Sequence, residues 1–206
     1  MIVLQFNEKD RIPYFLKDRP EITDCTGIPG TTGYCSPEAE KALKVKLAHI
    51  PENGIHYIGN GNYHYASLFF LEKIKEPFDL IVFDHHTDMQ ESAFGPVLSC
   101  GSWILFALER LEMLENVRVF GPPAEAVESL GAYDKDRIAF FTENSADRFL
   151  SGTAKKPVYL SVDLDVLAEK EYKTVWDQGS LTLKKLSEMI SVINSSCRVL
   201  GMDYCG

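Results

Sequence analysis

A short run of acidic and histidine residues follows one of the most apolar segments of the chain. Asp84-His85-His86-Thr87-Asp88 comes directly after the sequence Leu-Ile-Val-Phe. Because side chains alternate along an extended backbone, Asp84, His86 and Asp88 share one face if the strand persists, and His85 points elsewhere. Three ionisable groups on one face at the end of a buried strand are costly unless a cation binds them. We interpret the run as a metal site, and the alternative is a solvated turn.

A second pair of carboxylates lies at the end of another apolar segment. In Ser161-Val162-Asp163-Leu164-Asp165, two aspartates are separated by one residue, so they point to the same side of an extended chain. An Asp-x-Asp pair after a strand is also found in phosphotransfer enzymes and in unrelated metal sites. By itself it is a modest indication of function.

The third candidate segment is glycine-rich. Gly59-Asn60-Gly61-Asn62-Tyr63-His64 follows the run Ile-His-Tyr-Ile, and its glycines permit a tight turn and close approach of the backbone to a site. The segment lacks the lysine of a phosphate-binding loop. His64 is either a ligand near the start of the next helix or an ordinary capping or surface histidine.

The three segments are related by charge. Asp84, Asp88, Asp163 and Asp165 together contribute about four negative charges, which two divalent cations would neutralise. His64 and His86 would then serve as neutral imidazole ligands. Carboxylate-rich sites with some imidazole suit Mn²⁺ or a similar dication, and two such ions activate water for hydrolysis near neutral pH.

Short β-branched runs alternate with stretches of helical periodicity along the chain. The predicted strands are Ile55–Gly59, Asp79–Asp84, Val117–Phe120, Arg137–Phe141, Val158–Val162 and Val199–Met202. The predicted helices are Pro37–Ala48 with Ser36 as its N-cap, Tyr63–Lys75, Gly101–Glu112, Pro122–Leu130, Ala146–Leu150 and Thr182–Ser195. This alternation predicts a single α/β domain over residues 1–206, with a mostly parallel sheet covered by helices on both faces. In such sheets, ligands bind at the carboxyl ends of the strands.

The composition of the chain argues against nucleic-acid-binding, membrane-spanning and secreted proteins. The 206 residues carry a formal net charge of −9, which disfavours non-specific binding to nucleic acid and to anionic membranes. No apolar run approaches the roughly 20 residues that span a bilayer, and the N-terminus lacks the basic region of a signal peptide. The five cysteines are odd in number and form no Cys-x-x-Cys pair, so we expect free thiols in the cytoplasm.

The order of the three segments resembles that of the arginase/agmatinase/formiminoglutamase (ureohydrolase) superfamily. Residues 84–88 are similar to its Asp-x-His-x-Asp motif, and residues 161–165 to its Ser-x-Asp-x-Asp motif. Residues 59–64 are similar to its Gly-Gly-Asp-His element, with His64 at the histidine. The agreement extends from about residue 54 to the end of the sequence. The resemblance implies a three-layer α/β/α fold of the arginase/deacetylase type, a small-molecule substrate and assembly into a homo-oligomer.

The same resemblance implies a site with two manganese ions. One ion would be held by His64, Asp84, Asp88 and Asp163. The other would be held by Asp84, His86, Asp163 and Asp165, so that Asp84 and Asp163 bridge the two. The implied reaction is attack of a hydroxide, held between the ions, on a guanidinium carbon or a related C–N bond. Asp88 would also accept a proton from the water.

Three departures from the family pattern bear on the substrate. Cys100 in Ser99-Cys100-Gly101 replaces a histidine that the family uses for proton transfer, and it is either a catalytic residue or a small buried apolar one. Gln90 and Ser92–Leu98 do not reproduce the polar residues that bind the amino-acid end of arginine. Gly206 stands where the family has a substrate-contacting glutamate after Asp203, and we expect either a truncated chain or a natural lack of this carboxylate.

We therefore predict a metal-dependent hydrolase of a C–N bond, with classical arginase activity doubtful. Two alternatives remain open. The first is an amide hydrolase or deacetylase with a single zinc ion. The second is a non-catalytic family member that keeps the fold and binds the metal.

Overall fold

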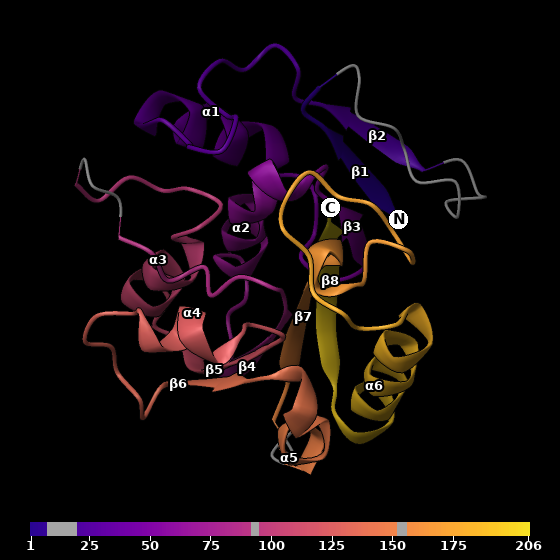
Figure 1. The fold of residues 1–206 in the computed structure, drawn as a ribbon. Coiled ribbons are helices and arrows are strands. Elements are labelled where there is room, and N and C mark those ends of the chain that lie inside the picture. Colours follow the sequence, from indigo (N-terminus) through magenta and orange to yellow (C-terminus); the bar gives the residue numbers. More distant parts are fainter. Residues whose placement is uncertain (8–19, 92–94, 152–155) are drawn as a thin grey trace.

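The core of the fold is one sheet of eight parallel strands. The computed structural model describes residues 1–7, 20–91, 95–151 and 156–206 (Figure 1). The strands occur in the order β2-β1-β3-β8-β7-β4-β5-β6, and every neighbouring pair is parallel. Their bounds are β1 Ile2–Gln5, β2 Glu21–Asp24, β3 Ile55–Tyr57, β4 Phe78–Phe83, β5 Leu114–Phe120, β6 Ile138–Phe141, β7 Val158–Asp163 and β8 Val199–Cys205.

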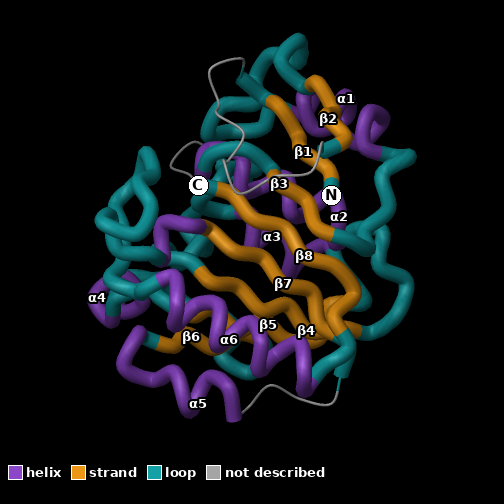
Figure 2. Tube along the Cα trace, turned by 90° about the vertical axis from the view of Figure 1, so that its right-hand side faces the viewer, coloured by secondary structure: helices purple, strands orange, loops and turns teal. Residues whose placement is uncertain are grey.

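Helices cover both faces of the sheet, so the predicted three-layer α/β/α class is confirmed (Figure 2). The helices are α1 Pro37–Leu47, α2 Ser67–Leu71, α3 Trp103–Arg110, α4 Ala124–Glu128, α5 Ala146–Ser151 and α6 Leu183–Ser196. Three short 3₁₀ turns complete the set: η1 Gly61–Ala66, η2 Glu143–Ser145 and η3 Leu164–Val166.

Side chains along the central strands point alternately to the two faces of the sheet, and the core therefore consists of two apolar clusters, one on each face. In β4, Leu80 and Val82 pack in the cluster formed with α1, α2 and α3. Ile81 and Phe83 of the same strand pack in the opposite cluster, which is formed with α5 and α6. A strand that is apolar on both faces is typical of a parallel sheet between helical layers. Across the part of the chain that the structure describes, no helix has the length and apolar character needed to cross a bilayer.

Four adjacent strands, β3, β8, β7 and β4, form the centre of the sheet. Because the strands are parallel, their carboxyl ends meet at one edge. His64 follows β3 in the turn η1, Asp84 follows β4, and Asp163 is the last residue of β7. The topology therefore brings the three sequence segments to one place, as expected for ligand sites in sheets of this kind.

The structure corrects several predicted element boundaries. β1 and β2 were not predicted, because each has four residues and neither shows a clear alternating pattern. The single helix predicted for Tyr63–Lys75 is instead the turn η1 followed by the five-residue α2. The helix predicted for Pro122–Leu130 shortens to Ala124–Glu128, and β8 extends three residues beyond the predicted Met202.

Candidate metal centre

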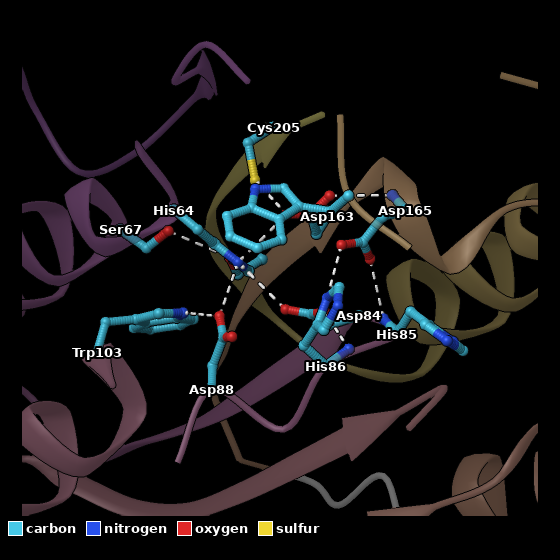
Figure 3. Close-up of polar contacts among 12 residues, drawn as sticks. His64, Ser67, Asp84, His85, His86, Asp88, Trp103, Asp163, Asp165 and Cys205 are labelled. Atoms are coloured by element: carbon cyan, nitrogen blue, oxygen red, sulfur yellow. Dashed lines mark hydrogen bonds and ion pairs between the residues drawn. The ribbon is translucent and has the colours of Figure 1, made fainter. Parts of the chain in front are cut away.

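The segment after β4 carries its side chains into the site without remaining extended. The strand ends at Phe83, and Asp88 adopts a left-handed backbone with φ of 49°. The prediction that an extended backbone aligns residues 84, 86 and 88 was therefore wrong. A turn brings these side chains together instead, and His85 points away from them (Figure 3). Asparagine and aspartate tolerate the left-handed conformation better than most residues, so Asp88 suits this position.

A first group of potential ligands surrounds His64. Its Nδ1 lies 3.2 Å from Asp84 Oδ2, 3.0 Å from Asp88 Oδ2 and 3.6 Å from Asp163 Oδ2. Metal–ligand bonds of about 2.0–2.2 Å place neighbouring donor atoms of one ion about 3 Å apart. His64, Asp84 and Asp88 therefore form one group whose donor atoms lie within 4.8 Å of one another, as the ligands of a single ion would, and Asp163 joins His64 in a neighbouring group.

A second group lies beside the first. His86 Nδ1 lies 2.9 Å from Asp165 Oδ2 and 3.5 Å from Asp84 Oδ1. Asp84 thus presents Oδ2 to the first group and Oδ1 to the second, and it belongs to both sets of close donor atoms. This is the arrangement of a carboxylate that bridges two ions (Figure 3).

The end of β7 is shaped by its own carboxylates. Asp163 Oδ1 accepts a hydrogen bond from the Asp165 backbone N–H at 2.9 Å, which starts the turn η3. Asp165 Oδ1 accepts from the backbone N–H of His85 at 2.9 Å, which joins the β4 and β7 segments. Each carboxylate keeps its second oxygen directed towards a histidine.

His64 is oriented by a chain of buried hydroxyls that the sequence did not reveal. Ser161 donates to Asp203 Oδ1 at 2.7 Å, and Ser67 donates to the same oxygen at 3.0 Å. Because the Ser161 proton is committed to Asp203, Ser161 Oγ accepts from His64 Nε2, 2.9 Å away. Nε2 thus donates its proton to Ser161, which leaves Nδ1 facing the three carboxylates. Such outer partners commonly fix the tautomer of a metal-binding histidine.

Asp88, like His64, is oriented by a buried hydrogen-bond partner. Trp103, the first residue of α3, donates its indole N–H to Asp88 Oδ2 at 2.5 Å. The Trp103 ring also lies 4.8 Å from the His64 ring, centroid to centroid. Trp103 therefore positions both residues. No spacing rule links positions 88 and 103, and only the packing of α3 shows their relationship.

Burial and mutual repulsion raise the pKa values of three of the four aspartates, Asp88, Asp163 and Asp165. Asp84 is the exception: burial raises its pKa, but contacts with His64 and His86 outweigh burial and lower it. Asp84, Asp88, Asp163 and Asp165 are each at most 5 % exposed. Burial, followed by the charge of Asp84, raises the pKa of Asp88 to about 7. The same two causes raise the pKa of Asp163, and burial with the charges of Asp163 and Asp84 raises the pKa of Asp165 well above its ordinary value.

The donor set fits divalent cations. Asp84 Oδ2 is buried and has no hydrogen-bond partner, although it faces His64 Nδ1. Carboxylates crowded in this way are stabilised in their charged form by a nearby cation. The described residues thus bring together all six predicted ligands, His64, Asp84, His86, Asp88, Asp163 and Asp165.

A pocket of about 400 Å³ opens onto the two groups. Trp176 forms part of its wall. Gly61 is required beneath it, because a Cβ there would lie 2.7 Å from Trp176 Cδ1 and 3.0 Å from Asp163 Oδ2. Cys100 also lines the pocket, and burial raises its pKa to about 12, so it is a neutral thiol at pH 7.

Known proteins resemble this chain in sequence and in fold. The model of the arginase family matches residues 15–205. The chain belongs to the arginase family. An uncharacterized protein from Thermotoga maritima is 33 % identical over 208 residues, which cover 99 % of this chain and 78 % of the relative.

Solved structures of arginase-family proteins share the fold. Proclavaminate amidino hydrolase from Streptomyces clavuligerus matches with a TM-score of 0.62 and 17 % identity, over 82 % of this chain and 60 % of its own. Formimidoylglutamase from Bacillus subtilis matches with a TM-score of 0.60 and 20 % identity, over 80 % of this chain and 56 % of its own. Arginase from Bacillus cereus matches with a TM-score of 0.62 and 17 % identity, over 90 % of this chain and 76 % of its own. The chain thus spans about 60 % of the length of the first two.

Removal of the hydroxyl that orients His64 is expected to weaken metal binding. Ser161→Ala deletes the acceptor of the Nε2 proton and frees the imidazole to rotate or change tautomer. Loss of such an outer partner typically costs about 10–100-fold in metal affinity. Ser67→Ala is the matched control, because it removes one donor to Asp203 and leaves the bond between Ser161 and His64. Equal metal dissociation constants for Ser161→Ala and wild type would contradict the orienting role.

The raised carboxyl pKa values predict that metal stabilises the protein more at higher pH. The pKa of Asp88, about 7 in the fold, exceeds the ordinary aspartate value of 3.8. The stability that this difference contributes to the metal-free protein is complete below pH about 3.8 and is lost as pH rises through about 7. We expect the gain in melting temperature on adding Mn²⁺ to be larger at pH 8 than at pH 5.5. An equal gain at both values would count against this account.

Proposed function

We propose that this chain is a metal-dependent hydrolase that cleaves a C–N bond in a small guanidino or amidino compound. The observation that carries the proposal is the pair of donor groups that share Asp84, one oxygen to each. Membership of the arginase family supports it. The names of the structural relatives, an amidino hydrolase and an arginase among them, describe chemistry of this class.

The donor set supports two divalent ions, and Mn²⁺ is the cation that the family resemblance predicts. His64, Asp84, Asp88 and Asp163 would hold one ion, and Asp84, His86 and Asp165 the other. Asp163, which the family resemblance also assigns to the second ion as a bridge, directs Oδ1 to the Asp165 N–H and Oδ2 to His64, so we propose Asp84 alone as the bridging carboxylate. Two bound dications neutralise the carboxylates and make water nucleophilic near neutral pH. A single-metal amide hydrolase would leave one of these groups without a role.

Asp88 is the residue best suited to take a proton from the attacking water. As a ligand of the ion that the His64 group would hold, its carboxylate would lie beside the water that this ion would activate. The Trp103 indole N–H holds Oδ2 in place. Cys100, a neutral thiol on the pocket wall, would act as a hydrogen-bond donor rather than as a base.

The pocket walls favour a cationic substrate. Glu91 and the aromatic side chains of Tyr34 and Trp176 line the pocket, and Tyr34 and Trp176 are 54 % and 43 % exposed. Aromatic faces and a carboxylate attract a planar guanidinium or amidinium group. Gly206 offers no room for a glutamate, because a Cβ there would lie 2.7 Å from Leu164 Cβ. We therefore do not propose arginine as the substrate.

The experiment is a substrate panel with the metal-loaded protein. Guanidino, amidino, formimidoyl and acylated-amine compounds are incubated with protein loaded with Mn²⁺ or with Zn²⁺, and the released urea, ammonia or carboxylate is measured. We expect turnover of at least one guanidino or amidino compound. Turnover of acylated amines alone, with one zinc ion per chain, would support the deacetylase alternative. Full metal loading without turnover of any compound would support a non-catalytic family member.

A further inference from the structure

Trp176 borders both groups of ligands from the loop of residues 167–182, which joins η3 to α6 and is called the Trp176 loop below. The Trp176 ring lies 5.9 Å from the His86 ring, centroid to centroid, with 72° between the two planes. The same indole lies over Gly61 of η1, the turn that also carries His64. Trp176 is 43 % exposed and lines the pocket, so part of the indole is free to contact a ligand there.

A single amide side chain holds the Trp176 loop in shape. Gln178 Oε1 accepts from the backbone N–H of Thr174 at 3.0 Å. Gln178 Nε2 donates to the backbone oxygens of Leu167 at 3.0 Å and Tyr172 at 2.8 Å. The amide thus spends its oxygen and both N–H groups on the backbone that surrounds Trp176.

The end of the loop that follows Gln178 is fixed to the rest of the fold. The Gly179 backbone N–H donates to the Asp165 backbone oxygen at 2.7 Å, and the Ser180 backbone N–H donates to Glu143 Oε1 at 2.7 Å. Glycine is needed at 179, because a Cβ there would lie 2.5 Å from the Val166 backbone oxygen. The indole is therefore preorganised at the pocket, and a preorganised group loses little conformational entropy when a ligand binds.

The charges around the indole favour a cationic ligand. Tryptophan binds cations over its ring face more strongly than the other aromatic residues do. Among the described residues that line the pocket there is no lysine or arginine, whereas Glu91 is one of them. A planar cation would therefore meet an attractive ring and a carboxylate without a competing positive side chain.

We propose that Trp176 is the specificity-determining residue of the pocket and that Gln178 is its positioning residue. The indole face binds the planar cationic end of the substrate, a guanidinium or amidinium group, and discriminates against uncharged planar groups of the same shape. Gln178 acts through Trp176 by holding the loop. This role rests on the proposed hydrolase function, which by itself assigns the choice of substrate to no residue.

The competing explanation is that Trp176 only shields the metal centre from solvent. The indole contacts His86 and covers Gly61, so its removal would then expose the ligands and lower the metal content. In that case a charged and an uncharged compound of one shape would lose equal amounts of affinity.

N-butylguanidine and N-butylurea distinguish the two explanations, because they have similar shapes and only the first is a cation. Calorimetry gives their dissociation constants for the metal-loaded protein, and KM is used, with kcat recorded beside it, for a compound that is hydrolysed. Trp176→Leu is expected to weaken binding of butylguanidine by about 3–30-fold and of butylurea by less than about 2-fold. Metal content and kcat are expected to stay as in wild type.

Val175→Ala is the matched control for a change in the same loop. Val175 is 67 % exposed and does not line the pocket. Both compounds are expected to bind this variant as they bind wild type.

Gln178→Met tests the positioning role, because methionine is of similar length and lacks the three hydrogen bonds of the amide. It is expected to weaken binding of butylguanidine in wild type and to have no further effect in Trp176→Leu, since coupled residues are not additive. Acrylamide quenching of tryptophan fluorescence is expected to increase, because the only other tryptophan, Trp103, is fully buried. An equal loss of affinity in both backgrounds would overturn the role of Gln178.

The outcomes separate this role from the hydrolase itself. Equal losses for the two compounds in Trp176→Leu, a loss of metal, or a wild type that does not prefer butylguanidine would overturn the role of Trp176. The hydrolase would still stand if wild type turned over a guanidino or amidino compound. Preferred binding of butylguanidine that depends on Trp176, without turnover of any compound, would overturn the hydrolase and leave the role of Trp176 in place.

Discussion

Asp84→Asn is expected to remove essentially all bound divalent metal from the purified protein. Asp84 is the residue whose two oxygens face the two histidines separately, so loss of its charge affects both ion positions. The backbone N–H of His86 donates to Asp84 Oδ1 at 2.6 Å, and asparagine can still accept this bond. The fold is therefore expected to persist, and elemental analysis measures the loss.

The same variant separates a metal ligand from a structural carboxylate. Metal at a hundredfold above its dissociation constant contributes about 2.7 kcal/mol per site, or a rise of about 5–10 °C in melting temperature for a chain of this size. We expect a rise of at least this size in wild type, which has two such positions, and none in Asp84→Asn. Without metal, the variant is expected to be less stable than wild type, because contacts with His64 and His86 outweigh burial and lower the pKa of Asp84, so that its charge stabilises the metal-free fold.

His85→Ala is the matched control for Asp84→Asn. The His85 side chain points away from the site (Figure 3), whereas its backbone N–H, which the substitution keeps, donates to Asp165. Metal content is expected to equal that of wild type. Full metal occupancy in Asp84→Asn, or equal losses in both variants, would contradict the bridging role.

Asp165→Asn is expected to empty only the position beside His86. Asp165 Oδ2 lies 2.9 Å from His86 Nδ1, whereas the donors around His64 do not include this carboxylate. Asparagine keeps an acceptor for the His85 N–H. A bound ion stabilises transition-state charge by several kcal/mol, so kcat is expected to fall by about 10²–10⁴-fold.

Metal content and kcat must be measured together in Asp165→Asn. The account predicts half the metal of wild type and the stated fall in kcat. Half the metal with unchanged kcat would show that one ion suffices, as the single-metal alternative requires. Unchanged metal content would show that Asp165 is no ligand.

The convergence of the ligands was predictable from the sequence because it depends on topology. Each pair of aspartates follows an apolar run, and parallel strands bring such residues to one edge of the sheet. The order of the segments also allowed the family to be identified, and the family match over residues 15–205 confirms it. Gly59 and Gly61 indicated that another group approaches the backbone closely. The Trp176 side chain makes this approach at Gly61, where a Cβ would lie 2.7 Å from Cδ1 of the indole.

The residues that support the ligands were not predictable from spacing. Ser161 was noticed only as part of a motif, and its bond to Asp203 joins neighbouring strands that are distant in sequence. Trp103 contacts Asp88 because α3 packs against the β4 segment. Asp88 itself reaches the site through a left-handed residue rather than an extended one. Tertiary contacts decide all three features, and local patterns carry little information about them.

The central claim is that the four aspartates lie together because dications hold them. Anomalous diffraction from crystals grown with Mn²⁺, and separately with Zn²⁺, tests it directly, since each anomalous peak locates a bound ion. The account predicts peaks on both sides of Asp84, one next to His64 and one next to His86. A map without an anomalous peak within bonding distance of Asp84, at saturating concentrations of either metal, would contradict it.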